Sequence, residues 1–525
     1  MGMSAARHAS VGLVVVVALG SGCDSLAPEC DPANLAAELR AATPGSTVTM
    51  GACRVEGSFR VPAGVTFAGQ GPASVVAPTL GSAIYLEPGV TPARVSNLAI
   101  EGTHVAGIAS APDGACGMPR AGGVVIERVS LSVRRGWGIY LSCLESAQIS
   151  DSVVHGPVTE ANHGAVALGR VRPIPVDVTV TCRDPIPSSE CTPGTTRPVS
   201  PADCPGCGVT EQTCDECGQW ASVTASHALH LVDVRATNVE NVTVSGFGLM
   251  TVAAVRSGMT WTTGSIADQL GVGLVSFSST VDLANVQVRT AWRNPMSDFD
   301  AIGVYATDSD VTSTDLSVRG SDGYGMVTSG GTSSLTNLTV AGNANAGLWA
   351  SRSTSFQLSG SHFADNALGG VVVMDSSGVS IRDTTVTGTR FRLRGGGGVE
   401  ATLGAGDGVL LRGTYTDVVL ERVTLENNER IGLLVDLGAM PDITFRDVSV
   451  SGSGTQLGAI GGTLTSALQL APILPGSGWD TGITRRGVTG TNDVSATGAV
   501  DVYGTADPTN IVPPDEAGGI SVPTD

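Results

Sequence analysis

A short pattern of apolar and small residues repeats through the middle of the chain. It occurs in the segments IGVYATDSD, YGMVTSGGT, AGLWASRST and GGVVVMDSS, where Gly303, Gly325, Gly347 and Gly369 follow one another at 22-residue intervals. Each unit also contains a second short strand-like segment, such as TDLSV or TNLTV. A period in the low twenties without helical patterning is typical of a β-solenoid, in which each coil buries its inward side chains only against its neighbours.

Looser copies of the pattern occupy most of the remaining chain. They share a polar residue followed by an alternation of apolar and polar positions, and they occur at Asn97, Arg128, Asn241, Asn285, Arg422 and Asp447. Their uneven spacing indicates loops of varied length at the turns. A leucine-rich repeat would need a leucine consensus, and a propeller would need a period about twice as long. The pattern therefore predicts an all-β solenoid.

Composition supports this interpretation and excludes several chemistries. Of the 525 residues 70 are Gly and only 15% are charged, as expected for many short strands joined by tight turns. All 29 basic residues are Arg, which excludes any mechanism that needs a lysine base or a Schiff base. The net charge of −19 makes nucleic acid and anionic membrane surfaces poor partners. We expect a self-repelling monomer.

The first 22 residues are typical of a secretory signal. Arg7 precedes an apolar run from Gly12 to Leu19, too short to span a bilayer, and small residues then lead to Cys23. This end resembles a bacterial lipoprotein signal, although Leu19 lies four places before the Cys and the usual leucine lies three. The resemblance implies export and lipidation of Cys23, with anchoring in the cell envelope at the outer membrane, on its periplasmic or surface side. The alternative is a secreted protein with Cys23 unpaired or in a disulfide.

All eleven cysteines lie in the first 217 residues. If Cys23 is lipidated, ten remain, an even number that indicates disulfides in an oxidising compartment. Proximity in sequence suggests three pairs, namely Cys30 with Cys53, Cys116 with Cys143, and Cys182 with Cys191. The CPGCG and CDECG motifs hold the last four, for which disulfides are expected and a structural zinc site is the alternative: Cys204, Cys207, Cys214 and Cys217.

The last six cysteines lie in a stretch rich in Pro and polar residues, at about 170–222, that lacks the strand pattern of its flanks. We interpret it as one long excursion, pinned covalently because it has little core of its own. Long insertions in repeat proteins often carry the binding face. A stapled loop without such a role is the alternative.

The chain after the signal resembles the pectate-lyase-like superfamily of right-handed parallel β-helices. The segment from Asp31 reads DPANLAAELRAATPGSTVTMGACRVEGSFRVPAGVTFAGQG, and members of the superfamily begin similarly, with an amphipathic capping helix and strands ending in V-T-F-x-G-x-G. The resemblance implies a cap at about residues 31–45, with Leu35, Leu39 and Ala42 on its apolar face. A cap is needed because an open end coil exposes unpaired backbone groups and apolar side chains.

The expected organisation has four parts. They are a signal peptide at 1–22, a right-handed parallel β-helix at 23–455 that includes the cap and the excursion, last coils or a C-terminal cap at 456–506, and a flexible tail at 507–525. Members of the superfamily cradle extended polysaccharides on their coil faces. The resemblance therefore implies a polysaccharide or another cell-surface partner, with membrane contact only through the lipid anchor.

The superfamily also includes polysaccharide lyases, glycoside hydrolases and epimerases, but their recognisable motifs are missing. The polygalacturonase set has only a faint echo in Asn162-His163-Gly164.

The repeat offers one candidate acid pair. Counting 22 residues from Asp300 leads to Asp322, then to Ala344 and Asn366, so the two carboxylates would lie about one strand spacing apart. Such a pair could act as acid and base or bind a cation such as calcium. Asp before Gly is equally an ordinary turn former. Three further candidates lie beside the pair as binding residues: Trp292, Arg293 and Tyr305.

A second candidate cluster lies on neighbouring coils near the base of the excursion. Arginines would hold acidic sugars, aromatic rings would stack on sugar rings, and His or Glu would transfer protons. Scattered surface residues would account for the same set. Its members are Arg134, Arg135, Trp137, Tyr140, His155, Glu160 and His163.

These observations favour a non-catalytic exported lipoprotein that binds glycan or another surface partner through a coil face or the Cys-rich excursion. The alternatives are a polysaccharide lyase or glycoside hydrolase with a degenerate site, and a structural or adhesive spacer. Convergent acids in one groove would indicate an enzyme, whereas an aromatic-lined face without them would indicate a binding module. No cofactor is expected apart from the zinc and calcium alternatives.

Overall fold

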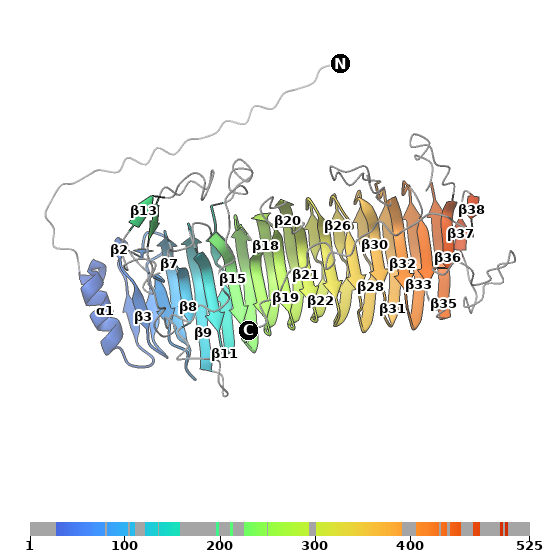
Figure 1. Ribbon diagram of the computed structural model, residues 1–525. Coiled ribbons are helices and arrows are strands. Elements are labelled where there is room, and N and C mark those ends of the chain that lie inside the picture. The colour runs from blue at the N-terminus through green and yellow to red at the C-terminus, as the bar shows by residue number, and fades with distance from the viewer. Residues whose placement is uncertain are drawn as a thin grey trace, which may run out of the picture.

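The computed structural model shows a long stack of β-coils with α1 at one end (Figure 1). It describes residues 28–78, 81–102, 105–110, 121–134, 136–157, 196–198, 211–213, 225–248, 250–292, 301–390, 406–429, 432–437, 442–452, 466–472, 494–496 and 499–501. Strands follow one another along the stack in chain order. Within these ranges no helix is long and apolar enough to cross a membrane.

The larger of the two main sheets, sheet A, has 21 strands in the part of the chain that the structure describes, and all of them pair in parallel. They are β1 (Thr47–Thr49), β2 (Arg54–Glu56), β4 (Thr66–Ala68), β5 (Val75–Ala77), β7 (Ala93–Glu101), β9 (Ala121–Ser132), β11 (Leu144–Ser150), β12 (Val153–His155), β16 (Ala236–Ser245), β18 (Gly258–Leu270), β20 (Thr280–Trp292), β22 (Asp310–Thr314), β23 (Ser317–Arg319), β25 (Thr332–Thr336), β26 (Thr339–Ala341), β28 (Ser355–Ser359), β29 (His362–Ala364), β31 (Val379–Thr387), β33 (Asp417–Glu426), β35 (Asp442–Ser451) and β37 (Val494–Ala496).

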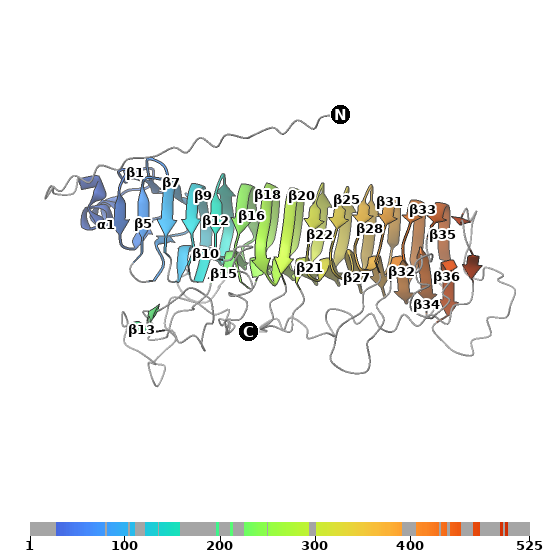
Figure 2. The same ribbon diagram turned by 90° about the horizontal axis from the view of Figure 1, so that it is seen from above.

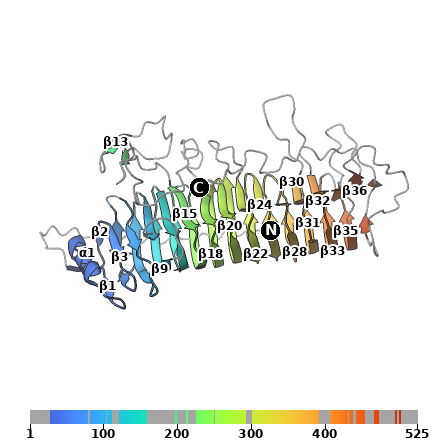
Figure 3. The same ribbon diagram turned by 60° about the horizontal axis from the view of Figure 1, so that its bottom comes forward.

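Sheet B has 15 described strands, also parallel, and runs along the opposite side of the stack (Figures 2 and 3). A separate antiparallel pair, β13 (Thr196–Pro198) and β14 (Glu211–Thr213), lies within the expected excursion. The strands of sheet B are β3 (Phe59–Val61), β6 (Ile84–Leu86), β8 (Ala106–Ser110), β10 (Gly136–Ser142), β15 (Ala225–Val232), β17 (Met250–Val255), β19 (Val272–Phe277), β21 (Ile302–Thr307), β24 (Tyr324–Ser329), β27 (Leu348–Ser351), β30 (Leu368–Met374), β32 (Gly406–Gly413), β34 (Leu433–Leu437), β36 (Ser466–Pro472) and β38 (Ala499–Asp501).

One coil of the regular central region shows how the chain turns. After β21 a corner at Asp308 leads into β22, a bend at Asp315 separates β22 from β23, and a corner at Gly320 returns the chain to sheet B as β24. In longer strands such as β20 the bend lies inside the strand, at Asn285. Each such coil contributes two segments to sheet A and one to sheet B.

The bend residues of sheet A form a column with left-handed backbone conformation. Asn and Asp tolerate this conformation better than most residues, and neighbours in the column also bond to each other, as Asn337 Nδ2 does to Asp315 Oδ1 at 3.1 Å. The polar residues that open the looser sequence repeats are therefore bend residues. The column, with φ from +47° to +59°, contains Asn97, Arg128, Asp151, Asn241, Thr263, Asn285, Asp315, Asn337, Gly360, Asp383, Arg422 and Asp447.

The predicted 22-residue interval holds twice and then fails. β27 pairs with β30 at an interval of 23 residues, so the glycine that stacks on Gly347 is Gly370 and not Gly369. The extra residue is accommodated where β30 begins, at Leu368, whose φ is +61°.

The same shift changes the predicted polar column. Asn366 stacks on Asn343, whose Nδ2 donates to Asn366 Oδ1 at 2.8 Å, so the prediction that it follows Ala344 is wrong by one residue. Both asparagines are buried. They satisfy backbone groups inside the corner, since Ser321 N also donates to Asn343 Oδ1 at 3.0 Å.

α1 (Pro32–Ala41) covers the first coil, which confirms the predicted cap. Asp31 caps the helix, because its carboxylate accepts hydrogen bonds from two backbone N–H groups of the first turn at 2.8 and 3.1 Å. Leu35 and Leu39 lie one turn apart and are fully buried, and Ala42 packs partly buried against the same core.

A disulfide ties the 3₁₀ turn η1 (Pro28–Cys30) to the first coils. It joins Cys30 to Cys53, with Cα atoms 6.0 Å apart, and confirms this predicted pair. Cys143 is also disulfide-bonded; its predicted partner Cys116 lies outside the described residues. So do Cys23, Cys182, Cys191, Cys204, Cys207, Cys214 and Cys217.

The stack is continuous across the expected excursion. β10 pairs directly with β15, and β11 and β12 pair with β16. The coils that end at Pro157 and resume at Ala225 therefore contact each other. A single apolar core runs inside the coils from Leu35 in α1 to Val450 in β35.

Candidate functional site

The outer face of sheet A carries a column of polar side chains. Strand alternation turns Val239, Trp261 and Leu283 into the core and their neighbours outward. These outward neighbours stack on successive coils and are exposed, and one of them is charged. The column consists of Gln148, Asn238, Thr260, Asp282, Thr312, Ser334 and Gln357.

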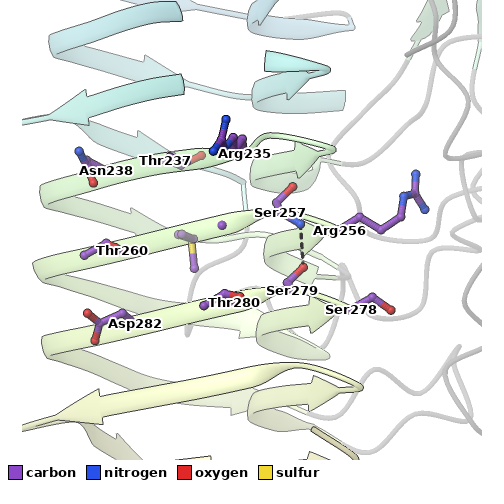
Figure 4. A pocket seen from close by; sticks show the side chains of 13 residues that line it. Arg235, Thr237, Asn238, Arg256, Ser257, Thr260, Ser278, Ser279, Thr280 and Asp282 are labelled. Carbon is purple, nitrogen blue, oxygen red and sulfur yellow. Dashed lines mark hydrogen bonds between the residues drawn. The ribbon is translucent and has the colours of Figure 1, made fainter. Parts of the chain in front are cut away.

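A groove of about 390 Å³ opens on this face where β16, β18 and β20 lie side by side (Figure 4). Asn238, Thr260 and Asp282 point into view one below another from the three strands. Two small residues of the lining, Ala236 and Gly258, leave the face hollow between larger neighbours. Serine and threonine supply most of the remaining lining, so the groove is rich in hydroxyl groups.

Two arginines at the edge of the groove are already paired. Arg256 Nε and Nη2 donate to the two carboxylate oxygens of Asp233 at 2.9 and 2.8 Å, and this hydrogen bonding raises the pKa of Arg256. Arg235 Nη1 donates to Glu145 Oε1 at 2.6 Å. The cationic groups of the groove are therefore each neutralised by a carboxylate of the preceding coil.

A second group of ring side chains belongs to a cluster on sheet B that is separate from the core. Trp137 and Tyr140 stack with ring centroids 4.9 Å apart, and His227 and His230 stack at 4.6 Å. Trp137 Nε1 donates to His227 Nδ1 at 3.1 Å, and the Tyr140 ring meets His230 edge-on at 5.5 Å. All four side chains are more than nine-tenths buried.

Burial keeps both histidines neutral near neutral pH. It lowers the pKa of His230 from 6.5 to about 4. Burial, followed by the proximity of His230, lowers the pKa of His227 well below 6.5. Because His227 Nδ1 accepts a hydrogen bond, the proton of the neutral ring is on Nε2. The histidines thus pack as uncharged rings on a strand face.

The structure separates members of the predicted cluster around these rings. Trp137 and Tyr140 lie in sheet B, whereas His155 lies in sheet A, where its Nδ1 is 2.7 Å from Ser245 Oγ. Their grouping was wrong because strands close in sequence occupy different sides of one coil. Arg134 is exposed. Arg135, Glu160 and His163 lie outside the described residues.

Of the predicted acid pair only Asp322 is described. It is exposed at the corner before β24, where its backbone N donates to the Ala291 carbonyl at 2.8 Å. Asp300 and Arg293 lie outside the described residues, so the pairing of Asp300 with Asp322 stays a prediction. The rings of Trp292 and Tyr305 are buried, a position in which their faces are not offered to solvent.

No group of three or more His, Cys, Asp or Glu side chains that could hold a metal occurs in the ranges that the structure describes. The four cysteines of the alternative zinc site lie beyond those ranges.

Sequence reasoning missed the groove. Its signal was present in ATNVE, GMTWT and TVDLA, three segments with outward polar residues at alternate positions. They align on three neighbouring strands only through the stacking register, which the uneven spacing of the loops conceals.

Comparison with known proteins agrees with this architecture. Residues 300–467 match a family model described as right handed beta helix region. The chain is a right-handed parallel β-helix protein. This confirms the predicted fold class, including its N-terminal helix. No curated protein matches the sequence.

Solved structures of β-helix proteins resemble the chain in fold. The A-module of a mannuronan C-5 epimerase from Azotobacter vinelandii is 13% identical over 90% of this chain and 95% of its own, with a TM-score of 0.36. A periplasmic alginate epimerase is 9% identical over 89% and 83%, with a TM-score of 0.37. The catalytic unit of an α-1,3-glucanase from Streptomyces thermodiastaticus is 10% identical over 90% and 65%, with a TM-score of 0.31.

Proposed function

We propose that this β-helix is a non-catalytic glycan-binding protein of the cell envelope, exported and anchored through a lipid on Cys23, and that the outer face of sheet A is its binding surface. The observation that carries the proposal is the polar column with its groove at Asn238, Thr260 and Asp282. Hydroxyl and amide groups exchange hydrogen bonds with sugar hydroxyls. Coils about 4.8 Å apart repeat these groups at regular intervals along the stack.

The composition of the groove favours binding over cleavage. Glycoside hydrolysis uses two carboxyl groups that flank the scissile bond, and lyases need a positioned base. The lining, all of it in the described part of the chain, contains one carboxylate, Asp282, and no histidine. Arg235 and Arg256 are engaged in ion pairs. A polysaccharide in this groove would thus meet hydrogen-bonding groups without an acid and base converging on one bond.

The proposal is tested by incubating the purified mature protein with a panel of neutral and acidic polysaccharides. Binding is measured by affinity electrophoresis and calorimetry, and cleavage by new reducing or unsaturated ends. We expect binding without cleavage, and about tenfold weaker binding after Asn238→Ala with Thr260→Ala, since each substitution removes a net hydrogen bond of roughly 1 kcal/mol. The matched control is Thr424→Ala on β33, far along the stack.

Two outcomes would count against the proposal. Cleavage that is lost in Asp322→Ala would support the alternative of a lyase or hydrolase. Absence of binding to every polysaccharide would favour the structural spacer. The proposed anchor is tested separately, because Cys23→Ser should move the protein from the detergent phase to the aqueous phase on phase partition.

A further inference from the structure

The charged groups around the groove of sheet A are arranged against anions. Arg256 is held by both carboxylate oxygens of Asp233, and Arg235 is held by Glu145. Asp282 adds a third carboxylate in the wall. The groove and its rim thus hold two guanidinium groups and three carboxylates. An incoming anion would have to displace a carboxylate from a guanidinium group and approach Asp282 at the same time.

The surroundings of the groove reinforce this arrangement. In the same column the next coils offer only amide and hydroxyl groups, from Gln148 on one side and Thr312 and Ser334 on the other. The chain as a whole carries a net charge of −19. A polyanion is therefore repelled both at long range and at the surface where it would bind.

We infer that this groove selects neutral polysaccharides and excludes polyuronates and other polyanions. The inference rests on the proposed glycan-binding function and adds the class of ligand. Neutral sugars need donors and acceptors instead of opposite charges, and Asn238 provides both, while Thr260 and Thr280 each provide a hydroxyl group. These three side chains are exposed.

The groove also determines how such a ligand binds. No aromatic ring occurs among its lining residues, all of which are described, so sugar rings find no stacking platform there. Binding depends on hydrogen bonds that repeat from coil to coil along the column. Affinity is then expected to rise with the length of the polysaccharide, because each further contact becomes intramolecular once the first has formed.

The decisive experiment frees the two arginines without removing them. Asp233→Asn with Glu145→Gln replaces their carboxylate partners by neutral amides of similar shape, and Asn suits the left-handed backbone of position 233, where φ is +55°. We expect the double variant to bind polygalacturonate and alginate at least about tenfold more tightly than the parent protein, since each free guanidinium group gains charge-assisted hydrogen bonds. Binding of a soluble β-glucan, a glucomannan and dextran should be unchanged.

A matched control makes the same change of charge outside the groove. Asp383→Asn with Glu421→Gln releases Arg422, and position 383 also has left-handed φ, of +48°. This control should not gain affinity for polyuronates. Should Asp233→Asn with Glu145→Gln fail to fold, as judged by circular dichroism, Thr280→Arg adds an unpaired guanidinium group to the groove and should produce the same gain.

The outcomes separate the inference from the proposed function. A parent protein that binds polyuronates as tightly as neutral glycans overturns the inference and leaves the glycan-binding function standing. So does a groove variant that gains no more affinity for polyuronates than the Arg422 control. If the parent protein binds no polysaccharide of either class, the proposed function and the inference fail together.

Discussion

His227 and His230 are the residues at which burial most clearly determines charge. Their rings stack against each other and contact Trp137 and Tyr140. The folded-state pKa of His230, about 4, lies below its unfolded value of 6.5, and the pKa of His227 is lowered in the same direction. Between these pH values the unfolded chain binds protons that the folded chain does not. The contribution to stability is therefore complete above pH 6.5 and is lost as the pH falls toward 4.

Substitution of His230 by Phe should remove part of this pH dependence. The loss avoided is about 3 kcal/mol between pH 7 and pH 4, since each pKa unit corresponds to about 1.4 kcal/mol. Urea unfolding at pH 7, 5.5 and 4 measures it. His362→Phe makes the same change at an exposed position of β29 and should leave the slope as in the parent protein. An equal slope in His230→Phe would show that His230 is not neutral in the folded state.

Residues of the bend column could be found in the sequence, whereas residues of the groove could not. Asn97, Asn241 and Asn285 mark their repeats because left-handed bends recur in every coil and favour Asn. The groove at Thr260 and Asp282 depends on which outward positions become neighbours across coils. That information is in the stacking register, which varies with the lengths of loops between coils.

At the scale of elements, α1 closes the open end of the stack. Its fully buried leucines, Leu35 and Leu39, occupy the apolar end of the first coil and pack toward β1 and β3. The disulfide between Cys30 and Cys53 holds the turn before the helix against the same coils. Without this cover the first coil would expose apolar side chains and unpaired backbone groups to water.

Leu39→Ala should loosen this end locally. Removing a fully buried leucine costs about 3 kcal/mol of stability at such sites, and in a stack of repeats the cost is felt first by the adjacent coils. Hydrogen exchange should accelerate at β1, β3 and β4 while β22 to β28 keep their protection. Glu38→Ala, at an exposed position of the same helix, is the control. Equal exchange in both variants would contradict a capping role for Leu39.

The cap and the strands of the regular region were predictable because each is encoded locally. The helix is marked by an N-cap aspartate, Asp31, and by leucines one turn apart. The interval from Gly347 to Gly370 was mispredicted because the extra residue is absorbed at Leu368, in a left-handed conformation that a leucine rarely adopts. Nothing in the local pattern announces that shift.

The whole molecule behaves as one stack because its core is continuous. Fifteen described strands of sheet B, spaced by about 4.8 Å, span about 67 Å. Each coil buries its apolar residues only against the coils before and after it. Stability therefore depends on close approach at every coil interface, including the one that spans the expected excursion between β10 and β15.

The glycine column inside sheet B makes that approach testable. A Cβ atom on Gly347 would lie 2.7 Å from the carbonyl oxygen of Gly370 and 2.7 Å from Asn366 Nδ2, so Gly347→Val should force β27 and β30 apart, at a cost of about 1 to 3 kcal/mol. Because coils stabilise one another only through neighbours, the parts on either side should then unfold separately, with two transitions in calorimetry where the parent protein shows one. Gly342→Asn is the control in the same coil, since nothing lies within 4 Å of its Cβ position and Asn accepts the φ of +65°. A single transition at the parent temperature in Gly347→Val would mean that the two halves are joined by more than coil stacking.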